Sequence, residues 1–521
     1  MDYVERHQWP PAVTFDGGDL DCGNGLLLLI RKHIDPLNDG QLLEIRSRES
    51  SVAEDLPAWC RMTRNELVSC TRHGDEWSYL VSKRAFIAPA APVAQPLNAA
   101  SETKRERSSM PLPAAVKPVH VPASLPPIAP APAIKPLSVM GIGSWPRPRW
   151  LLEALQQRLE GRLDEAEFQK TADDAVRLCV AAQTRAGVDV MTDGEQRRDN
   201  YASFVGALLD NCQLIPVTDL LPYVEAPAEF ERELKALDVP ADTVRHPAVF
   251  GRLGRSQPLA LHELQFLKTL TDIPRKAALP GPYLLTRTMW MECISDRAYA
   301  TREELAEDIV RVLREELFAL LADGVSLVQF DEPVLTEVVF SQAGGNRTFL
   351  CGALGAKRDP ETELRFALDL LNRVVNGVDL QRTALHVCRG NWSPDESVAL
   401  HGDYRPLLPY LRNVEVGTLM LELCTSRAGE LAVLADLPDR FRIGVGVVNQ
   451  KRPEIESHAE IRSKAEQAIQ LFGCERVLLN PDCGFATFAE NPVNSSEIAE
   501  RKLAAIASVA AELRQRHHLT K

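Results

Sequence analysis

Short apolar runs alternate with stretches of helical periodicity across residues 138–515, and this alternation constrains the fold more than any other feature of the chain. Eight runs have the length and composition of buried strands: 138–145, 188–194, 277–285, 325–331, 383–389, 417–423, 441–448 and 476–480. Strands separated by helices pair in parallel, because each helix carries the chain back along the sheet. Eight such units predict an α/β fold, a (β/α)8 barrel of the TIM type, with a doubly wound open sheet as the alternative.

Two of the predicted helices have clear boundary signals. Residues 301–304 (Thr-Arg-Glu-Glu) form a capping box, and the helix that they start is expected to end at Gly324. Residues 457–460 (Ser-His-Ala-Glu) form another, with an end expected at Gly473. The interval 196–276 is too long for one crossover, so we expect extra helices there.

An alanine- and proline-rich segment, residues 87–137, divides the chain into two modules. Such segments bury too little apolar surface to fold and favour extended conformations, so we interpret this one as a linker. The module before it, residues 11–86, has the order strand, helix, strand, helix, strand, which predicts a small two-layer α/β sandwich. Its second helix is expected at 55–62, with Pro57 in the first turn.

The composition argues against several classes of function. A formal net charge of −13 is unlike the basic balance of a general nucleic-acid-binding protein. No apolar run approaches the roughly 18 residues that span a bilayer, and residues 1–7 lack the basic and apolar regions of a secretory signal. Eleven cysteines without an export signal favour reduced thiols. We therefore expect a cytoplasmic protein with no nucleic-acid or membrane partner.

Polar side chains stand at the ends of the predicted strands of the large module. They are Ser144, Glu195, Asp331, Glu332, His386, Cys388, Glu422, Asp482 and Cys483. In a barrel of this type the C-terminal ends of the strands form the rim on which active sites are built. The positions of these side chains therefore predict one catalytic site on that rim.

His386 and Cys388 are the core of a predicted metal site. They lie two residues apart on one strand, so their side chains point to the same face. With Cys483 from another strand end they supply the nitrogen and sulfur ligands that zinc takes in tetrahedral sites, and thiolates exclude magnesium and calcium. The spacing leaves the fourth ligand open, because Glu422 and Cys424 share one face of a strand. Other cysteines are interpreted as small apolar packing residues: Cys179, Cys212, Cys293, Cys351 and Cys474.

The order of the motifs resembles that of the C-terminal catalytic barrel of cobalamin-independent methionine synthases. The matching residues are 141–146 (Gly-Ile-Gly-Ser-Trp-Pro), 193–195 (Asp-Gly-Glu), 329–333 (Gln-Phe-Asp-Glu-Pro), 386–388 (His-Val-Cys), Glu422 and 480–484 (Asn-Pro-Asp-Cys-Gly). The resemblance covers nearly all of residues 138–515 and is to the short, single-barrel type. Two departures are Asn449, where longer members have an acidic residue, and two extra residues between Glu422 and the following Ser-Arg.

The resemblance implies a Zn²⁺-dependent S-methyltransferase of methionine biosynthesis that methylates the thiol of homocysteine. It implies four zinc ligands: His386, Cys388, Glu422 and Cys483. It implies three residues that hold the carboxylate and ammonium groups of homocysteine, with Asp331 also counted as catalytic: Ser144, Glu195 and Asp331. A thiol bound to zinc loses its proton near neutral pH and becomes a better nucleophile, which agrees with this role. The methyl donor is left open between a methyl-folate and a methylated corrinoid protein.

The small module resembles the sulfur-carrier proteins of the TusA type. The matching residues are 15–16 (Phe-Asp), 21–23 (Asp-Cys-Gly), 31–32 (Arg-Lys), 55–61 and 66–69. Cys22 takes the position of the persulfide-carrying cysteine at the start of the first helix, where the helix dipole lowers the pKa of a thiol. The usual Cys-Pro-x-Pro is replaced by Cys-Gly-Asn-Gly.

Cys22 therefore raises an alternative activity, in which the small module delivers sulfur and the barrel alkylates or methylates another thiol or a persulfide. A sulfur-transfer partner of the small module belongs to this hypothesis. A module that only docks is the simpler interpretation. A zinc- or sulfur-responsive binding protein is the non-enzymatic alternative, and it has no need of the amino-acid pocket that Ser144, Glu195 and Asp331 predict.

Overall fold

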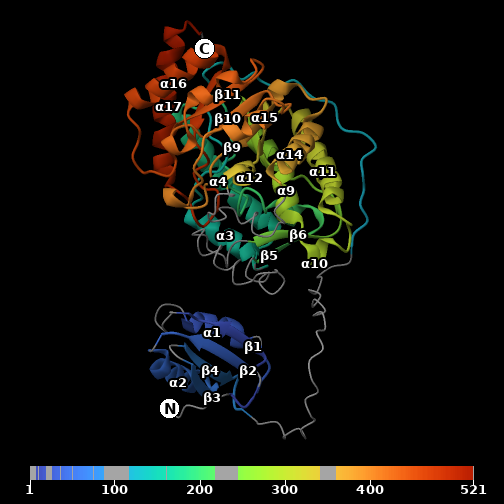
Figure 1. Ribbon diagram of the computed structural model, residues 1–521, viewed down its shortest axis with the longest axis vertical. Coiled ribbons are helices and arrows are strands. Elements are labelled where there is room, and N and C mark those ends of the chain that lie inside the picture. Colours follow the sequence, from blue (N-terminus) through green and yellow to red (C-terminus); the bar gives the residue numbers. More distant parts are fainter. Residues whose placement is uncertain are drawn as a thin grey trace. The chain divides into compact units, whose positions relative to one another are not determined.

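The computed structural model describes residues 7–9, 11–18, 26–35, 37–49, 51–73, 76–86, 116–159, 161–216, 245–340 and 359–519 (Figure 1). The chain divides into two compact units, residues 1–104 and 105–521. Within the described residues, no helix has both the length and the apolar character needed to cross a membrane.

The first unit is a two-layer α/β sandwich, as predicted. Its elements are β1 (Val13–Asp16), α1 (Leu26–Ile34), β2 (Leu42–Ser47), α2 (Val52–Thr63), β3 (Glu66–His73) and β4 (Glu76–Ser82). The sheet order is β1-β2-β4-β3, with β1 parallel to β2 and the other pairs antiparallel. Both helices contribute to one apolar cluster with the sheet, including Ile30, Ile45 and Tyr79.

Two expectations for this unit were wrong in detail. The fourth strand, β3, was not predicted, because polar residues interrupt it and it lies at the edge of the sheet. Helix α2 begins at Val52 instead of residue 55, so Pro57 lies inside the helix and not in its first turn. The proline removes one backbone hydrogen bond there, a cost that packing of Leu56 and Trp59 in the core offsets.

The second unit is a closed parallel barrel, which confirms the predicted (β/α)8 fold and excludes the open sheet. Six strands are hydrogen-bonded in the order β12-β11-β10-β9-β8-β7. They are β7 (Lys276–Pro280), β8 (Leu327–Asp331), β9 (Thr383–Val387), β10 (Thr418–Leu421), β11 (Arg442–Val448) and β12 (Val477–Pro481). Two shorter segments close the circle through single parallel bridges, which join Val139 to Leu479, Met140 to Val190 and Met191 to Arg275.

The predicted strand 277–285 is half helix. Strand β7 ends at Pro280, and α9 (Pro282–Met289) follows. A Cβ at Gly281 would lie 2.2 Å from Glu332 Oε1, and Pro282 suits the first helical position. Both predicted helix starts are confirmed, but only the second has a complete capping box, because the Glu304 carboxylate accepts from the Ala300 N–H instead of the Thr301 N–H. The Thr301 side chain accepts from the Glu304 backbone N–H at the start of α11 (Arg302–Ala322), and Ser457 and Glu460 form a reciprocal capping box at the start of α16 (His458–Phe472).

The remaining helices surround the barrel or shape its rim (Figure 1). The longer ones are α3 (Arg149–Leu159), α4 (Glu165–Ala186), α12 (Val334–Phe340), α14 (Pro360–Val375) and α17 (Ser496–Arg516). The short ones are α10 (Glu292–Ser295), α15 (Leu408–Leu411), η2 (Leu380–Arg382), η3 (Glu396–Val398), η4 (Arg405–Leu407), η5 (Ser426–Ala428), η6 (Leu431–Asp436) and η7 (Cys474–Arg476).

The excursion at residues 196–276 contains more than the expected helices. Besides α5 (Val205–Leu208) and α8 (Leu261–Lys268) it forms an antiparallel strand pair, β5 (Asp210–Pro216) with β6 (Arg245–Gly254). The sequence did not predict this pair, because pairing between distant strands leaves little local signal. Strand β6 brings His246 and Pro247 to the rim of the barrel.

The second half of the predicted linker, residues 116–137, lies along the barrel unit as extended chain (Figure 1). Asn211 makes two hydrogen bonds with the backbone of Lys117, of 2.7 and 3.0 Å. The Ala129 N–H donates to the Leu321 carbonyl oxygen at 3.1 Å. An extended proline-rich chain exposes its backbone groups, so neighbouring elements can hold it without a helix or sheet.

Candidate active site

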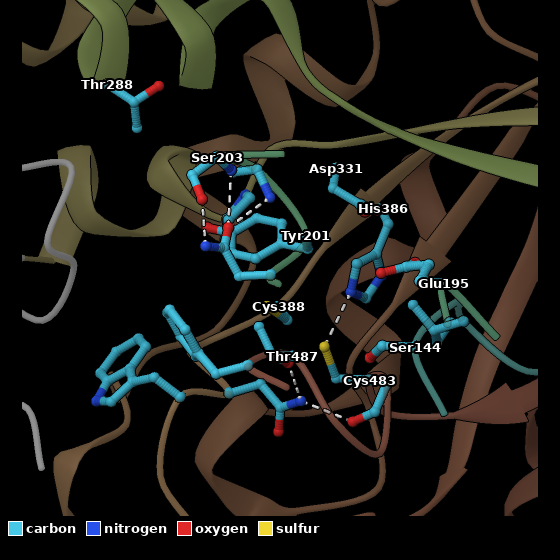
Figure 2. Close-up of a pocket in the computed structure, with 18 of the residues that line it drawn as sticks. Ser144, Glu195, Tyr201, Ser203, Thr288, Asp331, His386, Cys388, Cys483 and Thr487 are labelled. Atoms are coloured by element: carbon cyan, nitrogen blue, oxygen red, sulfur yellow. Dashed lines mark hydrogen bonds between the residues drawn. The ribbon is translucent and has the colours of Figure 1, made fainter. Parts of the chain in front are cut away.

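One pocket at the C-terminal ends of the barrel strands contains most of the predicted site residues (Figure 2). Six of them line it: Ser144, Glu195, Asp331, His386, Cys388 and Cys483. Each lies at or just after the end of a strand or of a bridged segment, so the barrel alone brings together residues separated by up to several hundred positions. Glu422 lies outside the lining.

His386, Cys388 and Cys483 form a compact cluster with the spacing of metal ligands. One ligand atom from each lies within 4.8 Å of the others, and all three side chains are buried. His386 Nε2 is 3.4 Å from Cys483 Sγ, and Figure 2 shows the imidazole directed toward that sulfur. His386 Nδ1 lies 3.0 Å from the Met420 carbonyl oxygen. Since a carbonyl only accepts, Nδ1 carries a proton there and Nε2 faces the thiols.

The pKa values of the two thiols of this cluster are shifted in opposite directions. A hydrogen bond from Cys483, with a further one from His386, holds the pKa of Cys388 well below its usual range, although burial opposes this. The same bond raises the pKa of Cys483. The thiolate is the form of cysteine that binds metals. The donor set therefore fits a zinc ion by both its chemistry and its spacing.

Neither candidate for a fourth ligand belongs to this cluster. Both oxygens of the Glu422 carboxylate are occupied. Oε1 accepts from Arg427 Nη2 at 2.7 Å and Nε at 3.1 Å, and Oε2 accepts from the Arg389 backbone N–H at 2.8 Å. Cys424 lies two residues further on and is partly exposed. Glu422 would have to exchange a hydrogen bond in order to bind a metal.

Glu195 and Asp331 form a second corner of the pocket, rich in negative charge. Both are buried, and Glu195 Oε2 has no hydrogen-bond partner in the described part of the protein. Burial raises the pKa of Glu195 to about 7, and the charges of Asp331 and Asp193 add to this against Arg198. Burial also raises the pKa of Asp331. Two buried carboxylates, one of which has an oxygen without a partner, suit the ammonium group of a ligand.

The backbone around Glu195 is shaped to bring its carboxylate into the pocket. Glu195 has φ +54°, a conformation that non-glycine residues rarely adopt. Position 143 requires a glycine because the Glu195 carboxylate packs directly against it: a Cβ at Gly143 would lie 2.0 Å from Glu195 Oε1. Ser144 completes this corner, and its Oγ accepts from the Ala486 N–H at 3.3 Å.

Lys276 lies beneath the carboxylate corner, and the sequence interpretation missed it. Its Nζ donates to the Gly141 and Ile142 carbonyl oxygens at 2.6 and 2.7 Å and to Gln329 Oε1 at 2.8 Å. The Gln329 amide in turn donates to Asp331 Oδ1 at 2.7 Å. Burial lowers the pKa of Lys276 to about 7 against the opposing charges of Asp331 and Glu195. At the start of a strand, a lysine gives no sequence sign that it points into a barrel.

Lys451 is a second buried cation near the cluster that the sequence interpretation missed. Its Nζ has no hydrogen-bond partner within the described residues. Burial and the neighbouring Arg427 lower its pKa, whereas Glu422, Cys483 and Cys388 raise it. The sequence does contain a signal for Lys451. It follows β11 closely, after Asn449 and Gln450, and residues just after a barrel strand lie on the rim.

The remaining predicted site residue, Cys22, lies outside the described residues. Its contacts and surroundings are therefore not part of the site geometry. The described cysteines of the first unit, Cys60 and Cys70, are both buried. Burial raises the pKa of Cys70 to about 11, as expected for a packing residue.

Comparison with known proteins identifies both units. The catalytic domain of cobalamin-independent synthases matches residues 137–506, and the sulfurtransferase TusA family matches residues 25–83. A methionine synthase of Sulfolobus acidocaldarius is 26% identical over 344 residues, which cover 66% of this chain and 84% of that protein. A methionine synthase of Thermococcus kodakarensis is 28% identical over 382 residues, with 71% and 95% covered.

Solved structures agree on the fold. A B12-independent methionine synthase from Shewanella sp. W3-18-1, in complex with selenomethionine, aligns with a TM-score of 0.55 at 21% identity. The alignment covers 74% of this chain and 100% of that one. At this identity the likeness supports the barrel fold.

Proposed function

Since the chain belongs to the cobalamin-independent methionine synthase catalytic-domain family, we propose that this methyltransferase methylates the zinc-activated thiolate of homocysteine to form methionine. One observation carries the proposal. A His-Cys-Cys cluster and two buried carboxylates line the same pocket, so a thiol and an ammonium group of one small molecule can be bound together.

We propose His386, Cys388 and Cys483 as zinc ligands, with Glu422 as the fourth and Cys424 as its substitute. Zinc held there would supply a positive charge that lowers the pKa of a substrate thiol and presents its thiolate. The Met420 carbonyl oxygen keeps the His386 ring in the orientation that ligation needs. Glu422 is favoured over Cys424 because its carboxylate lies against the backbone that follows Cys388, whereas the Cys424 thiol has a pKa raised by burial.

Homocysteine would lie between the two corners. Glu195 and Asp331 suit its ammonium group, because both carboxylates are buried and Glu195 retains an oxygen without a partner. Gln329, held by Lys276, orients Asp331 toward the pocket. Ser144 is placed to donate to the substrate carboxylate, since its Oγ accepts from the Ala486 N–H and keeps its own proton for another partner.

The test is a reaction with each donor in turn. Purified protein is assayed for zinc, then incubated with homocysteine and either 5-methyltetrahydrofolate or methylcobalamin, and methionine is measured by mass spectrometry. Methionine from one donor supports the proposal and identifies the donor class, a methyl-folate or a methylated corrinoid. Full zinc occupancy with no methionine from either donor would overturn it.

The TusA match favours a second activity for the small module. We propose residues 11–86 as a sulfur carrier, 87–137 as its linker and 138–515 as the barrel. A tethered module has a high effective concentration at its target, so Cys22 could bring a persulfide to the zinc thiolate site. Cys22→Ser should then abolish persulfide loading, seen as the mass of one added sulfur atom. Unchanged loading, or unchanged turnover with persulfide substrates, would reduce the module to a docking domain.

We also propose a cytoplasmic location. The cysteines whose side chains the structure describes are all free, including partly exposed Cys212 and Cys474. Free thiols are typical of a reducing compartment. Labelling of the native protein in cells with a thiol reagent would test this, since modified surface thiols are expected in a reducing compartment and oxidised ones elsewhere.

A further inference from the structure

The extended segment 116–137, which we call the strap, is bound to the barrel unit at several points (Figure 1). Near its middle, the Ala129 N–H donates to the Leu321 carbonyl oxygen, and Arg382 Nη1 donates to the Ala129 carbonyl oxygen, both at 3.1 Å. Further along the strap, Ile134 packs against an apolar cluster of barrel-strand residues. A segment that served only as a flexible tether would need none of these contacts.

The first residues of the strap are bound at a junction with β5 and β6, which is built around Asn211. The Lys117 N–H donates to Asn211 Oδ1 at 2.7 Å, and Asn211 Nδ2 donates to the Lys117 carbonyl oxygen at 3.0 Å. The same Nδ2 donates to the Arg252 carbonyl oxygen at 2.6 Å. Asn211 lies at the register shift of the strand pair and has φ +61°, which asparagine adopts more readily than most residues. One side chain therefore joins three segments.

Two glycines of β6 leave room for the strap. A Cβ at Gly251 would lie 2.9 Å from Val116 Cγ1, and a Cβ at Gly254 would lie 3.4 Å from Val119 Cγ2. Carbon atoms in good contact are about 3.5–4.0 Å apart, so position 251 has no space for a side chain while the strap is bound. The sequence of β6 is therefore matched to the bound strap.

The same strand forms part of the pocket wall. Its first residues, Arg245, His246 and Pro247, line the pocket. Gly251 follows Pro247 by four residues, which at about 3.3 Å per residue places the junction within about 13 Å of the wall along the strand. In the part of the chain that the structure describes, β6 pairs with β5 and with no barrel strand. Its position therefore depends on contacts such as the junction.

We propose that Asn211 is a positioning residue of the enzyme: together with the strap it fixes β6, and thereby the part of the pocket wall that β6 forms. Residues 116–137 then belong to the enzyme and not to the linker. The expected effect on turnover rests on the proposed function, whereas the expected effect on β6 does not. A displacement of about 1 Å far from the reacting groups can lower a rate about 100-fold.

Lys117→Pro tests the junction from the side of the strap, because proline lacks the N–H that donates to Asn211 Oδ1. Loss of one hydrogen bond should open the junction about 5-fold more often, seen as faster amide exchange of residues 245–250 by mass spectrometry. The kcat/KM for homocysteine should fall about 3- to 10-fold, with zinc content and Tm unchanged. The effect is partial because Arg252 also pairs with Glu304 of α11 at 2.7 Å.

Val121→Pro is the matched control. Val121 lies on the same strap, is 54% exposed and precedes a proline, as Lys117 does. Its N–H makes no backbone hydrogen bond within the described residues, so this variant should change neither the exchange of β6 nor turnover. Lys117→Ala keeps the backbone N–H and should also have no effect, since an ion pair of so exposed a side chain contributes little.

Asn211→Gly tests the junction from the side of β5. Glycine tolerates the positive φ, so the variant removes three hydrogen bonds without backbone strain. Exchange of β6 should rise about 30- to 100-fold, and kcat/KM for homocysteine should fall more than in Lys117→Pro. His518→Gly is the control, because His518 has φ +54° and lies outside the junction and the pocket. If the Tm shows that Asn211→Gly does not fold, Lys117→Pro decides the test.

The outcomes distinguish this inference from the proposed function. Unchanged exchange of β6 in Lys117→Pro, an equal rise in Val121→Pro, or a rise throughout the chain with a lower Tm would each overturn the inference. Faster exchange with wild-type kcat/KM would also overturn it, because the strap would then hold β6 without positioning the wall. Absence of methionine formation in the wild type would overturn the proposed function, and the exchange of β6 would then decide the inference by itself.

Discussion

The pocket has a metal corner, made of His386, Cys388 and Cys483, and a carboxylate corner, made of Glu195 and Asp331. The two corners differ in whether their polar atoms have hydrogen-bond partners when no ligand is bound. In the metal corner, His386 is held by the Met420 carbonyl oxygen, and Cys388 and Cys483 share a hydrogen bond. In the carboxylate corner, Glu195 keeps an oxygen without a partner and a backbone conformation with positive φ. The metal corner is therefore preorganised by its own donors, whereas the carboxylate corner keeps an oxygen that a ligand can occupy.

This difference makes the corners separable by experiment. A variant of the metal corner should lower the zinc content, and a variant of the carboxylate corner should lower kcat/KM for homocysteine. If each variant changes both the zinc content and the binding of homocysteine, the two corners act as one unit.

The largest effect is expected from loss of a thiol ligand. Cys388→Ser or Cys483→Ser should lose zinc and lower turnover by about a thousandfold or more, because the remaining donors cannot hold the metal. Zinc content and methionine formation are measured together. Cys474→Ser is the control, a partly exposed thiol outside the pocket that should change neither. Full zinc occupancy in both ligand variants would show that the metal corner is wrongly assigned.

Loss of a carboxylate should come next and leave the metal in place. Glu195→Gln or Asp331→Asn should lower kcat/KM for homocysteine by roughly 30- to 1000-fold, the cost of about 2–4 kcal/mol for removing one partner of a buried ion pair. Zinc content should remain at the wild-type level. Zinc loss in these variants would contradict the separation of the two corners.

A smaller effect is expected from the cation beneath the carboxylate corner. Lys276→Met removes the donor that holds Gln329, so Asp331 loses its fixed orientation. The KM for homocysteine should rise about 10-fold, in the range found for residues that orient a ligand from behind. Lys268→Met is the matched control, because Lys268 is exposed and contacts Asp323. An equal effect of both variants would indicate a general loss of stability, which their Tm values would reveal.

The most specific effect concerns pH. With the pKa of Glu195 raised to about 7, the carboxylate is protonated in acid and cannot bind an ammonium. In the zinc-loaded enzyme, kcat/KM for homocysteine should rise about 10-fold per pH unit toward pH 7 and then level off. Glu195→Gln should lose this dependence at a lower overall rate. A wild-type profile that is flat between about pH 5.5 and 7.5 would contradict the assignment.

The same pKa has a consequence for stability. Between about pH 4.5 and 7 the unfolded chain has released the Glu195 proton while the folded protein still binds it, so the free energy of unfolding falls as pH rises through that window. Glu195→Gln should therefore be more stable than the wild type at pH 8, by about 3 kcal/mol. Urea denaturation at pH 5 and pH 8 measures this difference.

The fold was largely readable from the sequence. Parallel barrel strands are buried on both faces, so they appear as apolar runs, and the capping residues of α11 and α16 mark their helices locally. The pairing of β5 with β6 could not be predicted, because the two strands are far apart in the sequence. Edge strand β3 was missed because most of its residues are polar.

The chain by itself determined which chemistry is available. A histidine and two cysteines at strand ends predict a thiolate metal site by residue type, and two carboxylates at other strand ends predict a place for a cation. Only the tertiary structure decided which polar groups are buried and which lack a partner. It brought Lys276 beneath Asp331 and paired Glu422 with Arg427. The reason is that burial and pairing depend on distant segments, whereas residue type and spacing are properties of the local sequence.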